Sequence, residues 1–72
     1  MYTIIKANTH PYPWVVLTLR SHTGEVGFWC ISDVHAEELI LQAYHTTSYE
    51  GVVLDALPEC GGWIDESDIN KL

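Results

Sequence analysis

The stretch that most constrains the fold is residues 14–31, WVVLTLRSHTGEVGFWCI. Two runs rich in β-branched, aromatic and aliphatic residues, 14–20 and 25–31, flank the polar sequence Ser-His-Thr-Gly at 21–24. This pattern predicts a β-hairpin. Large apolar groups occupy both faces of both strands, whereas a sheet with one face in water alternates more cleanly. We therefore expect the second face to be covered or to form an interface.

Three further segments are predicted to be extended. Residues 2–7 alternate weakly and are expected to form the first strand, after which Pro11 and Pro13 interrupt regular structure. Residues 51–57 read as a strand that Pro58 stops. Residues 63–64 have room only for a short fifth strand.

One helix is predicted after the hairpin. Ser32 is a suitable N-cap and Asp33 places an acid in the first turn, although His35 stands where Glu or Gln would complete a capping box. The helix ends before the β-branched and hydroxyl residues 46–48. Leu41 is an apolar residue beside the acidic face. The predicted buried stripe, at helical spacing, is Ala36, Leu39, Ile40, Ala43 and Tyr44.

The resulting order, β-β-β-α-β with a short fifth strand, predicts a small α+β fold, an antiparallel sheet with one helix packed across a face. Seventy-two residues make a single domain near the lower size limit for independent folding. No secretory leader and no run of about 20 apolar residues is visible. Cys30 and Cys60 are too few for a disulfide framework. We therefore expect free thiols and a cytoplasmic protein.

The net charge of −7 is unevenly distributed. Residues 1–31 contain Glu25 against Lys6 and Arg20, whereas residues 32–72 contain nine acids against Lys71 alone. Binding to phosphate backbones or anionic membranes needs clustered bases, so neither direct nucleic-acid binding nor membrane binding is expected. The acidic part suits a partner protein with a basic surface.

Metal binding and cysteine catalysis are weakly indicated. Four histidines and two cysteines lack the closely spaced pairs of structural zinc sites, so we expect no metal and no cofactor. Cys60 precedes Gly61 and Gly62, which offer flexible amides to a thiolate nucleophile. However, the adjacent Glu59 would raise the pKa of the Cys60 thiol, so a glycine turn is the simpler interpretation. No catalytic residues are assigned, and the chain is expected not to be an enzyme.

The remaining signal is surface character, because seven Trp and Tyr residues in 72 exceed what a small core readily buries with every polar group paired. Trp and Tyr are also enriched at binding hot spots. The predicted aromatic contacts are Tyr12, Trp14, Trp29 and Trp63. The predicted acidic contacts are Asp33, Glu37, Glu38, Leu41, Asp65, Glu66 and Asp68, where Leu41 is the apolar member.

These features predict a small non-enzymatic module that docks on a larger basic or nucleic-acid-handling protein and modulates it. The expected effect of docking is to inhibit that protein. By analogy of size and charge it is comparable to phage or mobile-element inhibitors, some of which imitate DNA phosphate. DNA mimicry would require the acids to line one surface. The alternatives are a homo-oligomeric assembly protein, such as a homodimer formed through the apolar hairpin, and a small metal-binding or Cys-dependent protein.

Overall fold

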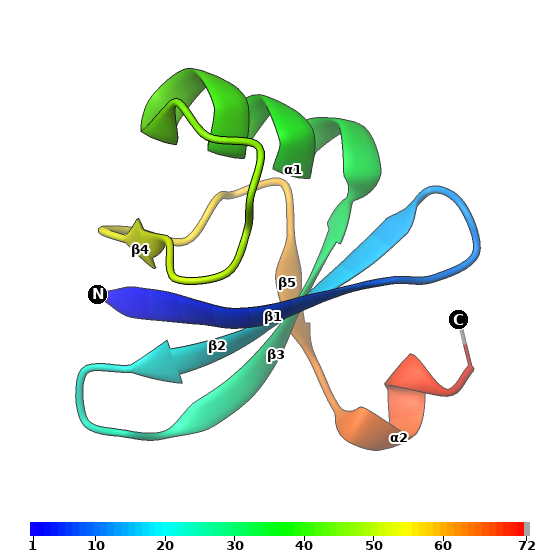
Figure 1. Ribbon diagram of the computed structural model, residues 1–72. Helices are drawn as coiled ribbons and strands as arrows, with labels where there is room; N and C mark the ends of the chain where they lie inside the picture. Colours follow the sequence, from blue (N-terminus) through cyan, green and yellow to red (C-terminus); the bar gives the residue numbers. More distant parts are fainter. Residues whose placement is uncertain (72) are drawn as a thin grey trace.

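Three long strands form the centre of a sheet in the computed structural model, which describes residues 1–71 (Figure 1). β1 (Tyr2–Thr9), β2 (Trp14–Ser21) and β3 (Val26–Ser32) pair antiparallel, and β4 (Val53–Leu54) and β5 (Gly62–Ile64) extend the two edges in the order β4-β1-β2-β3-β5. One helical segment packs against this sheet. The predicted small α+β fold, including the short fifth strand, is confirmed.

The predicted hairpin joins β2 to β3. Gly24 adopts a φ of +91°, which glycine reaches without steric cost, and its N–H donates to the carbonyl of Ser21 at 3.0 Å. The Ser21 hydroxyl accepts from the N–H of Glu25 at 3.1 Å. These bonds close the turn and fix the register, in which Leu17 lies opposite Trp29 and Val15 opposite Ile31.

The strand register divides the sheet into two faces, because successive side chains point to opposite sides. One face, which we call the core face, meets the helix. The opposite face is called the outer face. Side chains assigned to the core face by the register include Tyr2, Ile4, Val15, Leu17, Leu19, Gly27, Trp29, Ile31, Leu54 and Trp63. Those assigned to the outer face include Thr3, Lys6, Asn8, Trp14, Val16, Thr18, Arg20, Val26, Phe28, Cys30, Val53 and Ile64.

The hydrophobic core lies between the core face and the helix. Ile4, Leu17, Leu19 and Ile31 are completely buried, and Ala36 reaches them from the helix. Truncating a buried leucine of this kind to alanine typically costs about 2–5 kcal/mol, because transfer and cavity terms add. The core therefore depends on the same alternation that predicts the hairpin.

The helical segment begins as predicted. α1 (Asp33–Glu38) has Ser32 as its N-cap, and the Ser32 hydroxyl accepts from the N–H of His35 at 3.4 Å. The side chain of His35 bonds back to the same hydroxyl, with 2.6 Å between Nδ1 and Oγ. His35 thus occupies the place of the missing Glu or Gln, although its bond goes to the cap side chain.

The second half of the helix differs from the prediction. Residues Leu39–Ala43 form a π-helical segment, η1, whose wider turn shifts the side chains that follow. Ala36 and Ile40 are buried and Tyr44 is half-buried, but Ala43 is exposed. Ala43 was therefore wrongly assigned to the buried stripe. The segment ends at Tyr44, and the next residue, His45, has a left-handed φ of 54°.

The predicted strand at 51–57 is largely absent. Only Val53–Leu54 forms β4, whose Leu54 is buried opposite Tyr2. Before it, Gly51 has a φ of +85°, and after it Asp55 begins an exposed bend. Gly51 and Val52 still form hydrogen bonds with Ile4 of β1. However, aspartate is disfavoured in strands, and the pairing with β1 does not continue past Leu54.

The C-terminal part continues from β5 into a single helical turn, α2 (Glu66–Ile69). Asp65 is its N-cap residue by backbone geometry. Figure 1 shows α1 and α2 at different ends of the molecule, with the sheet between them. No helix within residues 1–71 combines the length and apolar character needed to cross a membrane.

Candidate functional site

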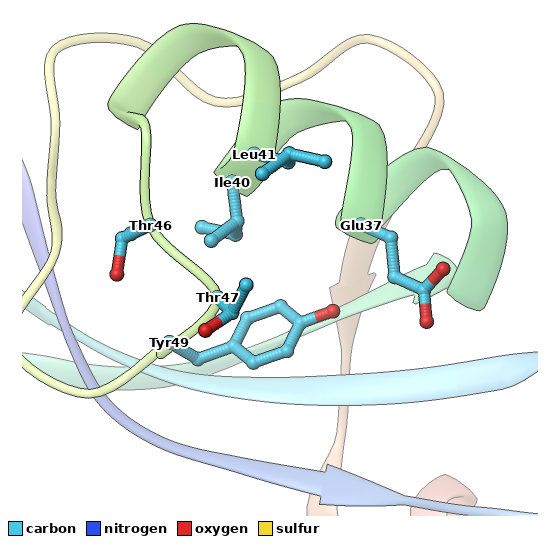
Figure 2. Close-up of a pocket in the computed structure, with 6 residues that line it drawn as sticks. All are labelled: Glu37, Ile40, Leu41, Thr46, Thr47 and Tyr49. Atoms are coloured by element: carbon cyan, nitrogen blue, oxygen red, sulfur yellow. The ribbon is translucent and has the colours of Figure 1, made fainter.

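An open groove of about 260 Å³ lies between the helical segment and the chain that returns from it to the sheet. Figure 2 shows Ile40, Thr47 and Tyr49 facing one another across this space, with Glu37 at one end and Thr46 at the other. We call it the helix groove. Its lining residues are Glu37, Ile40, Leu41, Thr46, Thr47 and Tyr49.

The walls of the helix groove differ in character. Ile40 is buried at 2% exposure and anchors the groove to the core, whereas Leu41 is 56% exposed. The opposite wall carries the half-buried ring of Tyr49 and the hydroxyl groups of Thr46 and Thr47. The phenol oxygen of Tyr49 points toward the end of the groove at which Glu37 stands (Figure 2). The groove thus combines an apolar strip, an aromatic ring and one carboxylate.

The groove is electrostatically negative. The pKa of Tyr49 is raised, first by burial and then by the negative charges of Asp33 and Glu37. Within residues 1–71 the only side-chain ion pair joins Lys71 to Asp68, at 3.6 Å. The carboxylates of α1 are therefore not neutralised by a lysine or arginine of the described chain.

The predicted acidic contacts fall into two groups. Asp33, Glu37 and Leu41 lie at or near the helix groove, and Glu38 is exposed on α1 without lining it. The second group surrounds α2, at the other end of the molecule in Figure 1. Its members are Asp65, Glu66 and Asp68. Together the two groups do not form the single acidic surface that imitation of DNA would require.

The predicted aromatic contacts are also separated. Tyr12, in the loop before β2, is 82% exposed, and Trp14 on the outer face is 40% exposed. Trp63 is 54% exposed and packs edge-on against Tyr2 and Trp29, with ring centroids 5.7 and 5.2 Å away. Trp29 itself is only 7% exposed and belongs to the core, so it is not available to a partner.

Trp63 borders a second hollow of about 230 Å³ near the β2–β3 turn. Gly27 contributes its floor because a glycine leaves room for the indole ring, and Glu25 is the one charged side chain of its lining. This hollow therefore offers an aromatic surface with a single carboxylate. It contains none of the predicted acidic contacts.

The outer face of the sheet is not covered by α1 or η1, which pack on the core face, yet Val16 at its centre is only 2% exposed. Trp14, Val26 and Val53 are exposed there at 40, 56 and 42%. Lys6 and Arg20, two of the three basic residues of the chain, are exposed on the same face. The molecule thus presents bases on the outer face of the sheet and acids along the helix.

The two cysteines differ in environment, and both are free thiols. Cys30 is half-buried on the outer face, and burial raises the pKa of its thiol. Cys60 is exposed in the loop before β5. Within residues 1–71, no three His, Cys, Asp or Glu side chains come close enough together to hold a metal ion.

Sequence reasoning identified Leu41 and Glu37 but missed the opposite wall of the groove. Thr46 and Thr47 were interpreted only as residues that end the helix, and Tyr49 only as one aromatic among seven. The signal in the sequence was Leu41, because an exposed apolar side chain beside acidic residues is typical of an interaction surface.

No protein-family model, curated protein or solved structure matches the chain. Function is therefore inferred from the geometry and charge of the molecule itself.

Proposed function

We propose that this protein is a small non-enzymatic binding module that docks, through the helix groove, on a larger protein with a basic surface. The observation that carries this proposal is the arrangement of exposed Leu41, half-buried Tyr49 and un-neutralised Glu37 around one open groove. Protein interfaces combine apolar or aromatic anchors with charged groups in this way.

Affinity and orientation would come from different parts of this surface. Leu41 and Tyr49 supply apolar and aromatic area, whose removal from water favours association. Asp33, Glu37 and Glu38 create a negative field that attracts a basic partner and favours one orientation. Because Lys6 and Arg20 lie on the outer face, the basic partner would meet the helix side of the molecule and not the sheet side.

Docking would act by covering a surface of the partner, which inhibits it. The groove, at about 260 Å³, lies just below the roughly 300–1,000 Å³ typical of small-molecule sites. It is therefore better suited to accept one or two side chains of a partner protein than to enclose a small-molecule substrate. A compact acidic domain can block a basic site on its partner without any chemistry of its own.

The test is affinity capture from the source cells with four tagged proteins: wild type, Leu41→Ala, Glu37→Gln and Val34→Ala. Val34 is a matched control, because it is 53% exposed on α1 but does not line the groove. We expect wild type and Val34→Ala to retain one stoichiometric basic protein at low salt, and both groove variants to lose most of it. Retention should fall as salt rises, because exposed charges are screened. Equal retention by all four proteins would contradict the proposal.

Self-assembly through the outer face is the second candidate. The observation that favours it is the exposure of Trp14, Val26 and Val53 on the outer face, around a centre where Val16 is buried. A face-to-face stack would place the unpaired Lys6 and Arg20 of both copies in or beside one interface, which is unfavourable and ranks this candidate second. Light scattering coupled to gel filtration separates the two. A dimer that becomes monomeric in Trp14→Ser supports assembly, and a monomer at all concentrations excludes it.

A further inference from the structure

We propose that the helix groove receives the side chain of an arginine of the partner, with its methylene groups along Ile40 and Leu41 and its guanidinium between Tyr49 and Glu37. This inference rests on the proposed function, in which the groove is the docking site. It adds the chemical identity of the group that is bound.

The shape of the groove suits one long side chain. On the helix side Leu41 offers an exposed apolar side chain next to the buried Ile40, and Thr46 and Thr47 line the opposite side (Figure 2). The groove opens to solvent, so a side chain of another molecule can enter it. A side chain that is apolar near its backbone and polar at its tip matches this order of surfaces.

The charge of the groove selects a cation. Glu37 lines it directly, and Asp33 contributes to the negative field felt by the Tyr49 hydroxyl. No basic residue within positions 1–71 pairs with either carboxylate, since Lys71 pairs with Asp68 and both Lys6 and Arg20 lie on the outer face. The carboxylates therefore keep their capacity to bind a cation from another molecule.

Arginine fits better than lysine for two reasons. Its planar guanidinium stacks on an aromatic face, and Tyr49 presents its ring to the groove. It also donates several N–H groups in a fixed fork, which can engage both oxygens of the Glu37 carboxylate. The ammonium group of lysine is a compact point charge and gains less from a ring and a planar carboxylate.

The experiment is a titration of the ¹⁵N-labelled full-length protein with the blocked tripeptide Leu-Arg-Leu. Two further peptides carry citrulline, the neutral analogue of arginine, or lysine at the central position. We expect the arginine peptide to bind with a Kd of about 1 mM, shifting the amide signals of Glu37, Leu41, Thr46, Thr47 and Tyr49. Citrulline should weaken binding about tenfold, which corresponds to about 1.4 kcal/mol, and lysine about threefold.

Two variants of the protein complete the experiment. Glu37→Gln keeps the size of the side chain, removes the charge and should weaken the arginine peptide about tenfold. Glu38→Gln removes a charge from the neighbouring exposed position outside the groove and should change binding by less than twofold. Unchanged spectra of both free variants establish that each is folded.

Equal affinity for the citrulline and arginine peptides would overturn the inference, as would equal affinity for lysine or shifts confined to another surface. The two proposals fail separately. If the peptides show no arginine preference while capture of the partner still depends on Leu41 and Glu37, the groove docks a different group and the proposed function stands. If capture is also independent of these residues, the proposed function falls.

Discussion

The indole ring of Trp63 lies over Gly27 on the adjacent strand, so closely that a β-carbon at Gly27 would come within 2.7 Å of Cζ3. Trp63 pairs with Trp29, and Gly27 is the diagonal neighbour across the β3–β5 ladder. Diagonal neighbours lie within reach of aromatic side chains, and an aromatic ring over a strand glycine compensates for the missing side chain. The absence of a side chain at Gly27 is therefore part of how the short edge strand β5 packs.

Gly27→Ala is expected to destabilise the wild-type protein by about 1 kcal/mol, because the half-exposed ring of Trp63 must move off the strand. In a Trp63→Ala background the same substitution should stabilise by roughly 0.5 kcal/mol, because alanine is less costly than glycine within a strand. Urea unfolding of the four proteins in this double-mutant cycle measures both effects. An effect of Gly27→Ala of the same sign in both backgrounds would show that the contact with Trp63 is not what requires glycine.

A second close approach concerns Gly61, which precedes β5. A β-carbon there would meet the indole nitrogen of Trp29 and would lie 2.7 Å from the carbonyl oxygen of Cys30. Trp29 is buried and Cys30 is held in the sheet, so neither neighbour can move easily. Gly61→Ala should therefore lower the free energy of unfolding by about 2 kcal/mol or more.

The matched control for Gly61 is its neighbour Gly62, where a β-carbon would meet nothing within 4 Å. We expect Gly62→Ala to change the free energy of unfolding by less than about 0.5 kcal/mol. Thermal or urea unfolding of the two variants side by side makes the comparison. A similar loss in both variants would show that the close approach to Trp29 and Cys30 does not set the cost at Gly61.

The elements that the sequence predicted best are those whose apolar residues alternate over many positions. In residues 14–31, a shift of register by one residue would move Val15, Leu17 and Leu19 out of the core, so burial on one face specifies the pairing. The face that meets the helix was not predictable in the same way. Both faces are apolar, and only the packing of Ala36 and Ile40 identifies Trp29 as a core residue.

The elements that were predicted wrongly depend on contacts distant in sequence. β4 is limited to two residues because the left-handed Gly51 precedes it and a bend at Asp55 follows it, and the alternation within residues 51–57 does not encode these limits. The π-helical turn at Leu39–Ala43 likewise moved Ala43 to the surface. The helix groove arises because His45 takes a left-handed conformation, after which the chain turns back beneath the helix. Histidine is among the residues that tolerate this conformation, but its presence alone does not predict it.

The two thiols should react at different rates. Cys60 is exposed, whereas Cys30 is half-buried and burial raises the pKa of its thiol above the ordinary value near 9. The thiolate is the nucleophile. At any pH below the thiol pKa, a raised pKa therefore lowers the fraction of the cysteine that is thiolate. At about pH 8, which lies below the ordinary thiol pKa, we expect Cys60 to react with a thiol reagent about ten times faster than Cys30.

Cys30→Ala and Cys60→Ala proteins leave one thiol each and allow the two rates to be measured separately. In concentrated guanidinium chloride the rates should become similar, because the difference comes from the folded environment. Equal rates in the native proteins would indicate that Cys30 is more accessible than its position on the outer face implies.

The final prediction concerns Tyr49, whose pKa is raised above its ordinary value near 10 by burial and by the charges of Asp33 and Glu37. The native protein therefore retains the phenol proton to higher pH than the unfolded chain does. The resulting stabilisation is fully present below about pH 10 and is lost as the pH rises through the native pKa. Glu37→Gln should lower the pKa of Tyr49 but leave it above its ordinary value, because the contributions of burial and Asp33 remain.

Difference absorption of the phenolate, taken between each protein and its Tyr49→Phe counterpart, isolates this one tyrosine among four. Glu38→Gln serves as the control and should leave the titration of Tyr49 unchanged, because Glu38 does not contribute to its shift. A midpoint unaffected by Glu37→Gln would mean that the carboxylate does not act on the Tyr49 hydroxyl. The groove would then lack the negative end that an incoming guanidinium requires, so this titration tests the electrostatic basis of docking without any partner present.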